Sequence, residues 1–419
     1  MSILDGLPLA PKQIRSIADS ERSYLSIWSG AVRSGKTVAS IIAFFIAVAK
    51  APAEGEIAIF GKTRETIERN ILGPMMTASL VGIFARQVHH VPGSNVAIIL
   101  GRRVSLIGAN DVRAEEKVRG MTLCLAMLDE ATLVPEAFWN MVMSRLSVPG
   151  ARMLATTNPD ARSHWLRKEW ILKATEKGIA HWHFTLDDNP FLTPEFVMRT
   201  KANYAGLWYK RFVLGEWVQA EGAIYDMWSE EKHVVDTLPP MHFIPAIGVD
   251  YGTANVFAAL ALGLGIDGRL YFTSEYRYEA KQVGRQLTDA QYVSKLRHWR
   301  DEERIDPQFV VVDPSASSFI TELLFDGWTP TKGDNAVLDG IRLVSSLIAT
   351  DRLRVHRSCT GLIDEFPSYC WDDKAQLEKG EDKPVKLDDH SLDGGRYAIK
   401  TTEFLWSNRL RPVSLPQAA

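Results

Sequence analysis

The chain has 419 residues, a formal net charge of −3 and 24% charged residues. This length exceeds what one hydrophobic core usually serves, so we expect two domains. The small net charge excludes a uniformly basic coat for nucleic acid, and any contact with DNA must therefore be regional. The three cysteines form no paired motif, which argues against a disulfide framework or a zinc site and fits a reducing compartment. The chain shows no secretory signal pattern and no apolar run long enough to span a bilayer, so we expect no membrane association.

Gln13 lies shortly before the first predicted strand, residues 24–28. Its amide offers both a donor and an acceptor, as reading the edge of an adenine requires. We therefore expect Gln13 to contact the base of a bound nucleotide. A glutamine that only faces solvent is the alternative.

The sequence GAVRSGKT at residues 30–37 follows this strand and precedes an almost wholly apolar segment, residues 38–49. Strand, glycine-rich loop and helix in this order are the context of a phosphate-binding loop, whose backbone N–H groups point at phosphate oxygens. Lys36 is expected to reach the β- and γ-phosphates, and Thr37 to hold Mg²⁺. A chance glycine turn before a buried helix is the alternative. The sequence thus predicts a site for ATP with Mg²⁺ that is formed by Gly30, Arg33, Ser34, Gly35, Lys36 and Thr37.

Strands are expected at residues 56–60, 95–100 and 104–108, with a helix at 63–71. The next apolar strand, residues 123–128, ends in Asp129 and Glu130. In a P-loop protein such a strand delivers Asp129 to the magnesium ion, and Glu130 is placed to polarise the attacking water. An acidic strand end that caps the following helix is the alternative.

The apolar run at residues 152–155 leads into Thr156, Thr157 and Asn158. Hydroxyl and amide groups beside the γ-phosphate can sense hydrolysis through hydrogen bonds, so we expect these residues to couple hydrolysis to motion. Arg33, inside the loop, and Arg119, before the Asp-Glu strand, are candidates to neutralise charge in the transition state. An arginine in this role contributes about 10³ to 10⁵ in rate, in cis or across a subunit interface. Solvated or salt-bridged surface arginines are the alternative.

Domain boundaries follow from the Pro239-Pro240 pair, which marks a linker. We expect a P-loop ATPase domain at residues 1–220, a linker at 221–240 and a second domain at 241–419. The second domain is predicted to open with antiparallel strands at 244–252, 256–263 and 270–273, the first of which carries Asp250 near its end. A helix at 281–300 and a strand at 309–312 follow.

Asp250 and Asp313 each stand at the end of a predicted strand of the second domain, and a later helix carries Asp389, His390 and Asp393 on one face. Carboxylates from two strand ends and a helix suit hard divalent cations. Two such metals, about 3.5 to 4 Å apart, can activate water and steady the leaving oxygen of a phosphodiester. We expect one or two Mg²⁺ or Mn²⁺ ions on Asp250, Asp313 and Asp393, with Asp389 or His390 able to share the role. Unrelated surface carboxylates are the alternative.

Taken together, these motifs resemble the large terminase subunit of tailed bacteriophages over nearly the whole chain. The most telling elements are Asn189-Pro190-Phe191-Leu192 and Gly215-Glu216-Trp217, which generic P-loop ATPases lack. The resemblance implies an α/β protein in which a P-loop ATPase of the additional-strand, catalytic-glutamate type precedes a ribonuclease-H-like nuclease domain. In related enzymes an alanine often follows the last aspartate, where this chain has Gly394, and glycine weakens a helix by about 1 kcal/mol relative to alanine.

The resemblance also implies a function. ATP hydrolysis would drive translocation of double-stranded DNA into the procapsid, and a metal-dependent endonuclease would cut concatemeric DNA at initiation and termination. The implied partners are double-stranded DNA, the portal protein, the small terminase subunit and further copies in a ring on the portal, while an isolated chain would be a monomer. The implied location is the cytoplasm of the infected bacterial host, outside the mature virion. Two alternatives stay open: a helicase-like or repair ATPase with a non-catalytic DNA-binding C-terminal module, and an assembly adaptor on the portal that uses ATP as a switch.

Overall fold

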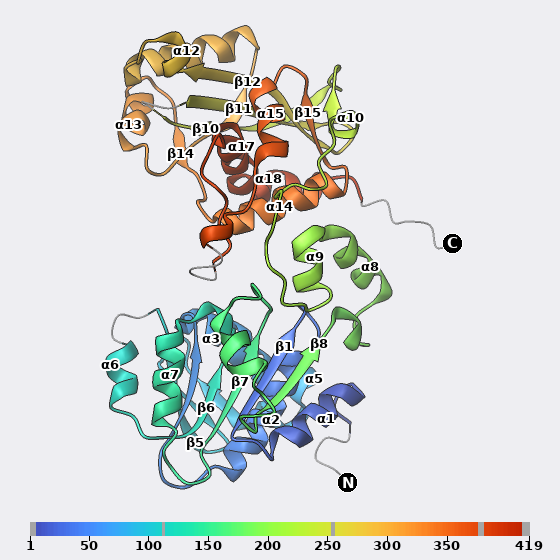
Figure 1. Cartoon of the computed structure of the whole chain (residues 1–419), viewed down its shortest axis with the longest axis vertical. Coiled ribbons are helices and arrows are strands. Elements are labelled where there is room, and N and C mark those ends of the chain that lie inside the picture. Colours follow the sequence, from blue (N-terminus) through green and yellow to red (C-terminus); the bar gives the residue numbers. More distant parts are fainter. Residues whose placement is uncertain (1–5, 111–113, 253–255, 376–380, 413–419) are drawn as a thin grey trace. The chain divides into compact units, whose positions relative to one another are not determined.

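A computed structural model describes residues 6–110, 114–252, 256–375 and 381–412 (Figure 1). The described residues form two compact units that divide between residues 219 and 220, except that 198–206 group with the second unit and Glu381 with the first. Each unit is a mixed α/β structure around its own sheet. Among the residues that the structure describes, no helix is long and apolar enough to cross a bilayer.

The first unit contains an eight-stranded sheet in the order β3-β4-β5-β2-β6-β7-β1-β8 (Figure 1). β3, β4 and β5 pair antiparallel at one edge, whereas all other pairs are parallel. β7 lies between β1 and β6, the position expected for the extra strand of an additional-strand ATPase. The strands are β1 (Leu25–Gly30), β2 (Glu56–Gly61), β3 (Val88–His90), β4 (Val96–Ile99), β5 (Arg102–Gly108), β6 (Leu123–Leu128), β7 (Arg152–Thr157) and β8 (Ala180–Phe184).

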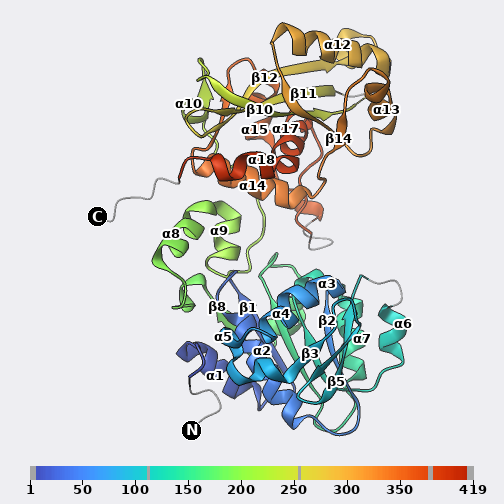
Figure 2. The ribbon, with the colours of Figure 1, turned by 180° about the vertical axis from the view of Figure 1, so that it is seen from behind.

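Helices cover both faces of this sheet because its central strands are apolar on both sides, as parallel strands usually are. α2 packs on one face through Phe44 and Phe45, and α7 packs on the other through Phe138 and Trp139 (Figures 1 and 2). The helices up to the division are α1 (Pro11–Ser20), α2 (Lys36–Lys50), α3 (Arg64–Ile67), the π-helix η1 (Glu68–Leu72), α4 (Gly73–Met75), α5 (Ala78–Val81), η2 (Gly82–Gln87), α6 (Ala114–Arg119), η3 (Ala131–Leu133), α7 (Glu136–Arg145), η4 (Leu166–Ile171), η5 (Leu186–Asp188), α8 (Pro194–Asn203) and α9 (Gly206–Phe212).

The second unit contains a seven-stranded sheet in the order β14-β13-β10-β11-β12-β15-β9. β10, β11 and β12 form the predicted antiparallel series, and β13 joins β10 in parallel. The strands are β9 (Val234–Val235), β10 (Met241–Asp250), β11 (Val256–Gly265), β12 (Leu270–Glu279), β13 (Pro307–Val312), β14 (Pro330–Lys332) and β15 (Leu353–His356).

The helices of the second unit also lie on two faces of its sheet (Figure 1). α12 and α13 bury Tyr292 and Phe319 against one face, whereas α17 packs on β10 and β11 from the other. The helices are α10 (Glu230–His233), α11 (Ala280–Val283), α12 (Asp289–Glu302), α13 (Ser317–Phe325), α14 (Val337–Ala349), α15 (Thr360–Ser368), α17 (His390–Thr401), α18 (Glu403–Trp406) and η6 (Ser407–Arg409).

Two predicted segments differ from the structure. Residues 221–240, expected as a linker, contain α10 and β9, and β9 pairs with β15, so this stretch belongs to the second unit. The helix expected at 281–300 is two helices, because Gly284 ends α11 in the left-handed region (φ +70°) and Thr288 caps the start of α12.

Candidate functional site

The first candidate site lies where β1, β6 and β7 end at the same edge of the sheet. Here the chain leaves β1 through Gly30 and enters α2 at Lys36. A Cβ on Gly30 would lie 2.0 Å from the carbonyl oxygen of Phe184, and that oxygen accepts a hydrogen bond from Ala31 N at 2.7 Å. Gly35 precedes the helix with φ +85°, a conformation that glycine adopts without strain. The predicted phosphate-binding loop therefore has the shape that its glycines indicated.

Lys36 is buried, and its ammonium group donates to two acceptors of the first unit. Nζ lies 2.7 Å from Oδ1 of Asn158 and 3.0 Å from the carbonyl oxygen of Ala31. Burial lowers the pKa of Lys36 to about 8, although the charges of Asp129 and Glu130 act in the opposite direction. The side chain is thus a desolvated cation with weak neutral partners, which suits it to a phosphate ligand. Thr37 follows as the second residue of α2.

Asp129 and Glu130 follow β6 at this edge. Thr156 Oγ1 donates to Asp129 Oδ1 at 2.6 Å, and Asn70 Nδ2 lies 3.4 Å from the other carboxylate oxygen. Burial raises the pKa of Asp129 against these hydrogen bonds and the charge of Lys36. Burial also raises the pKa of Glu130, helped by the charge of Asp129. A divalent cation here would relieve both carboxylates, so the donor chemistry fits Mg²⁺.

The three polar residues at the end of β7 connect these groups. Thr156 holds Asp129, and Asn158 holds Lys36. Thr157 accepts the backbone N–H of Thr132 and donates to its hydroxyl at 3.0 Å. β7 therefore carries hydrogen bonds to the loop lysine, to the carboxylate and to the turn after Glu130.

Gln13 is buried, whereas the two candidate arginines are exposed. The Gln13 amide is buried, accepts from Ala10 N at 2.7 Å and donates to the carbonyl oxygen of Gly35 at 2.8 Å, so both of its ends bind the chain itself. Ser34 donates to the carbonyl oxygen of Ala31 at 2.8 Å inside the loop. Arg33 and Arg119 are both exposed. Their assignment as transition-state cations stays a prediction.

Several residues that support this site carry little or no signal in the sequence. Asn189 Nδ2 donates to the carbonyl oxygen of Arg33 at 2.7 Å and so ties the loop to the segment after β8. On the other side, η1 presents Asn70 to Asp129, and Arg69 donates to Asn70 at 3.2 Å. Short π-helical turns of this kind are frequent at functional sites. The only signal for Asn189 was its place in the Asn-Pro-Phe-Leu element, and Asn70 carried none.

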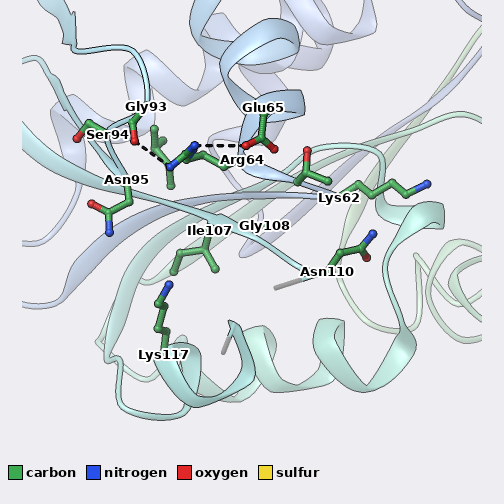
Figure 3. A pocket seen from close by; sticks show the side chains of 12 residues that line it. Lys62, Arg64, Glu65, Gly93, Ser94, Asn95, Ile107, Gly108, Asn110 and Lys117 are labelled. Atoms are coloured by element: carbon green, nitrogen blue, oxygen red, sulfur yellow. Dashed lines mark hydrogen bonds and ion pairs between the residues drawn. The ribbon is translucent and has the colours of Figure 1, made fainter. Parts of the chain in front are cut away.

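A pocket of about 560 Å³ opens beside the ends of β2 and β5 (Figure 3). Lys62, Arg64 and Lys117 line it from different parts of the first unit, and Arg64 donates to the carbonyl oxygen of Gly93 at 2.8 Å and to Glu65 at 3.3 Å. The charge of Lys62 also acts on Glu130 and lowers its pKa. Lys62 therefore lines the basic pocket and also acts electrostatically on Glu130.

The second candidate site lies in the second unit, where β10, β13 and α17 bring three aspartates toward one another. Asp250 ends β10, Asp313 follows β13, and Asp393 lies in the first turn of α17. Burial raises the pKa of Asp250, and the charges of Asp393 and Asp313 raise it further, while a hydrogen bond from His390 opposes them. The charges of Asp313 and Asp393 thus both reach Asp250.

Each carboxylate already has a partner in the chain. His390 Nδ1 lies 2.8 Å from Asp250 Oδ2, and Asp313 Oδ1 accepts the backbone N–H of Ser315 at 2.8 Å. Lys386 and Arg396 both pair with Asp393 at 2.7 Å. Among the described residues, no group of three or more His, Cys, Asp or Glu side chains is arranged to hold a metal ion. The donor chemistry fits a hard divalent cation, and each of the three carboxylates is also engaged by a partner within the chain.

A polar network fixes the start of α17. Arg277 donates to Glu365 at 2.6 Å and to Ser391 at 2.7 Å, and Ser391 donates to Glu275 at 2.5 Å. Glu365 also accepts the backbone N–H of Leu392 at 2.9 Å, which satisfies one of the free donors of a helix N-terminus. These contacts orient the turn that carries His390 and Asp393.

Gly394 lies in α17 where the helix meets the sheet. A Cβ on Gly248 of β10 would lie 2.1 Å from the carbonyl oxygen of Gly394, so the two backbones touch. The helix continues through Gly394 and Gly395 to Thr401 because close packing on β10 and β11 compensates for their low helix propensity.

The fold and the two sites define a two-domain α/β protein in which a P-loop ATPase of the additional-strand type precedes a ribonuclease-H-like domain. The large terminase from a thermophilic bacteriophage has the same architecture, with 33% sequence identity over 94% of this chain and 99% of that one and a TM-score of 0.84. The chain therefore belongs to the large terminase subunits of tailed bacteriophages, the family of viral DNA packaging.

Two further comparisons involve nucleotide complexes of that same thermophilic phage terminase. The complex with ADP is 33% identical over 95% of this chain and 100% of that one, with a TM-score of 0.81. The complex with ATP-γ-S is 32% identical over 93% and 98%, with a TM-score of 0.79. The family described as terminase large subunit, T4likevirus-type, N-terminal, matches residues 27–231. No curated protein matches the chain.

Proposed function

We propose that this protein is an ATP-driven translocase for double-stranded DNA whose second domain is a metal-dependent endonuclease for concatemeric DNA. The observation that carries the proposal is that a single chain holds two separate acidic sites. Asp129 and Glu130 lie beside a phosphate-binding loop, whereas Asp250, Asp313 and Asp393 lie in a unit whose described residues contain no such loop. The first site suits nucleotide hydrolysis and the second suits phosphodiester hydrolysis.

ATP hydrolysis is assigned to the first site. Lys36 binds the β- and γ-phosphates in place of Asn158 and the Ala31 carbonyl, and the loop N–H groups bind the remaining oxygens. Thr37 and Asp129 would hold Mg²⁺, which would neutralise phosphate charge when bound. Glu130 orients the attacking water and accepts its proton. The thermophilic phage terminase that was solved with ADP and with ATP-γ-S supports nucleotide binding by this fold.

Coupling is assigned to the end of β7. A phosphate would compete with Asn158 for the ammonium group of Lys36, and a metal ion would compete with the Thr156 hydroxyl for the carboxylate of Asp129. Both hydrogen bonds involve residues at the end of β7. Thr157 then passes changes in them to the turn at Thr132, which begins the path to α7.

Contact with DNA in the first unit is assigned to the basic pocket of Lys62, Arg64 and Lys117 (Figure 3). Cations of this kind bind phosphate oxygens without reading sequence. Because the charge of Lys62 also acts on Glu130, a phosphate in the pocket would alter the electrostatics of hydrolysis.

Phosphodiester cleavage is assigned to Asp250, Asp313 and Asp393, with His390 or Asp389 able to complete the ligand set. One or two Mg²⁺ or Mn²⁺ ions would supply an activated water and stabilise the leaving oxygen. The chain's own contribution is to fix three carboxylates on β10, β13 and α17 and to hold the helix by its N-terminal network.

The proposed partners are further copies of this chain, the portal protein and the small terminase subunit. A ring of subunits on the portal of the procapsid, with DNA delivered by the small terminase subunit, would act in the cytoplasm of the infected bacterial host and leave no copy in the mature virion. Arg33 and Arg119, both exposed, are the side chains assigned to reach a neighbouring nucleotide in such a ring.

The decisive experiment is cleavage of supercoiled plasmid by the full chain with Mn²⁺, Mg²⁺ or EDTA, comparing the wild type with Asp313→Ala, alongside ATPase assays of Lys36→Ala and Glu130→Ala. We expect metal-dependent cutting that Asp313→Ala removes and that both ATPase variants keep. Undiminished ATP turnover in both Lys36→Ala and Glu130→Ala would contradict the assignment of ATP hydrolysis to the first site.

A motor whose second domain only binds DNA is the alternative. The observation that favours it is that the described residues hold no ready-made group of metal ligands. Absence of cutting with every metal, together with intact ATPase activity, would favour this alternative.

A further inference from the structure

Lys386 precedes α17, and its ammonium group lies between two carboxylates of that helix start. Nζ is 2.7 Å from Asp393 Oδ2 and 3.0 Å from Asp389 Oδ2. Asp389 and Asp393 are only 6% and 7% exposed, whereas the Lys386 side chain is 57% exposed. Buried carboxylates are costly without a counter-charge. Lys386 supplies that charge from the solvent side.

The neighbouring groups show why a cation is needed at this position. The charges of Asp393 and Asp313 add to burial in raising the pKa of Asp250, so the carboxylates repel one another. His390 pairs with Asp250. Lys386 meets the negative charge of Asp389 and shares that of Asp393 with Arg396. Burial lowers the pKa of Lys386, but these two carboxylates raise it further than burial lowers it.

The two oxygens of Asp393 are held in different ways. Oδ1 accepts from Arg396, which is 2% exposed and lies inside α17. Oδ2 accepts from Lys386, whose side chain can swing into solvent. A metal ion that binds Asp393 can therefore displace the lysine far more easily than the arginine.

We propose that Lys386 is an internal counter-ion that occupies the place of a divalent cation at Asp393 and must leave before a metal binds. This inference rests on the proposed nuclease site and adds a competitor within the chain. Since ammonium and metal compete for one carboxylate oxygen, removing the ammonium strengthens metal binding. A lysine that merely positioned the ligands would have the opposite effect on removal.

The first test is calorimetric titration of Mn²⁺ into the full, nucleotide-free, EDTA-treated chain. We expect Lys386→Met to bind Mn²⁺ about tenfold or more tightly than the wild type, since hydrogen bonds to charged groups are worth about that factor. Lys386→Arg, which keeps the charge, should bind as the wild type does. Lys400→Met is the matched control, because Lys400 lies in α17 but pairs with Glu403.

A second test needs no variant. Acetylation of Lys386 by a low dose of acetic anhydride, followed by peptide mass spectrometry, should rise several-fold when Mn²⁺ is added, because the metal frees the amine. Acetylation of Lys400 should stay constant. An unchanged rate at Lys386 under saturating Mn²⁺ would overturn the displacement.

Asp250→Asn identifies the site that is being titrated. If Asp250→Asn loses the binding while Lys386→Met binds no tighter than the wild type, the role of Lys386 is overturned and the nuclease site stands. If the wild type and Asp250→Asn bind Mn²⁺ alike, the metal does not use these carboxylates, and both the nuclease site and the role of Lys386 fall.

Discussion

Gly248 and Gly394 meet backbone to backbone, but they do so asymmetrically. A Cβ on Gly248 would lie 2.1 Å from the Gly394 carbonyl oxygen, whereas a Cβ on Gly394 would come no closer than 3.2 Å to the Gly248 carbonyl oxygen. This contact seats α17 on β10 and brings Asp393 toward Asp250. The strand position therefore has no room for a methyl group, whereas the helix position is only tight.

Gly248→Ala should destabilise the second domain by about 3 kcal/mol or more, because overpacking at a backbone contact forces the helix away from the strand. Gly394→Ala should change the free energy of unfolding by less than about 1 kcal/mol, since helix propensity offsets the tight contact. Differential scanning calorimetry of the full chain measures both, with the second-domain transition identified as the one that ATP-γ-S does not shift. Equal losses in the two variants would contradict the asymmetry.

Nucleotide binding should be linked to protonation of Lys36. Burial lowers the pKa of this amine to about 8, so at pH 9 most of it is neutral in the nucleotide-free protein. Binding of ATP-γ-S restores the charge and should take up close to one proton at pH 9 and almost none at pH 7. Calorimetry in buffers of different ionisation enthalpy measures this uptake. Lys36→Arg, which stays charged, is the control and should show none at either pH.

The same pKa fixes the sign of a stability effect. Above pH 8 the folded, nucleotide-free protein binds this proton less tightly than the unfolded chain, whose amine titrates near 10.5. The contribution of Lys36 to the free energy of unfolding therefore increases from about pH 8 to 10.5. Urea unfolding of the wild type against Lys36→Met over this range checks it, and a falling difference would contradict it.

Asn189→Ala should weaken ATP binding about two- to tenfold while leaving kcat nearly unchanged. The variant removes the hydrogen bond to the Arg33 carbonyl, which is worth about 0.5 to 1.5 kcal/mol, but it removes no group assigned to the reaction. Steady-state ATPase kinetics measure KM and kcat separately. Asn140→Ala, an exposed position on α7, is the matched control. A fall in kcat with constant KM would instead assign Asn189 to catalysis.

Lys62→Ala should weaken binding to DNA equally for unrelated sequences and reduce the slope of log K against log salt by about 0.9, the effect of one lost phosphate contact. Lys50→Ala is a suitable control because Lys50 ends α2, away from the pocket of Lys62, and pairs with Glu21. Fluorescence anisotropy with two duplexes at several salt concentrations measures the slope. An unchanged slope in Lys62→Ala would remove the pocket from the DNA contact.

Much of the first site was predictable because its parts are short and contiguous. The loop at residues 30–37 and the pair Asp129-Glu130 are each recognisable from a few consecutive residues, and each follows an apolar strand. Asn70 and Asn189 were not predictable, since each gains its role from a partner that only the folded sheet brings near. Gln13 was expected to contact the base of a bound nucleotide, which stays a prediction. Its amide hydrogen-bonds to Ala10 and Gly35, and no motif reveals these two partners.

The second site shows a different limit. Strand ends and helix spacing indicated the three aspartates, and β10, β13 and α17 do converge. The sequence pattern predicts carboxylates that are free to bind a metal ion. In the folded chain, however, Asp393 is already paired with Lys386 and Arg396. The counter-charges come from a loop and from the same helix, and neither position carries a recognisable motif.

β7 also limits how this protein can change in length. The strand pairs with both β1 and β6, and its side chains alternate between the two faces of the sheet. A one-residue insertion within β7 would therefore move each of Thr156 and Thr157 to the face opposite its present one. Such an insertion would uncouple the lysine from the carboxylate in one event. Insertions after Pro159 leave that register intact, and we expect natural length variation in this part of the chain to begin there.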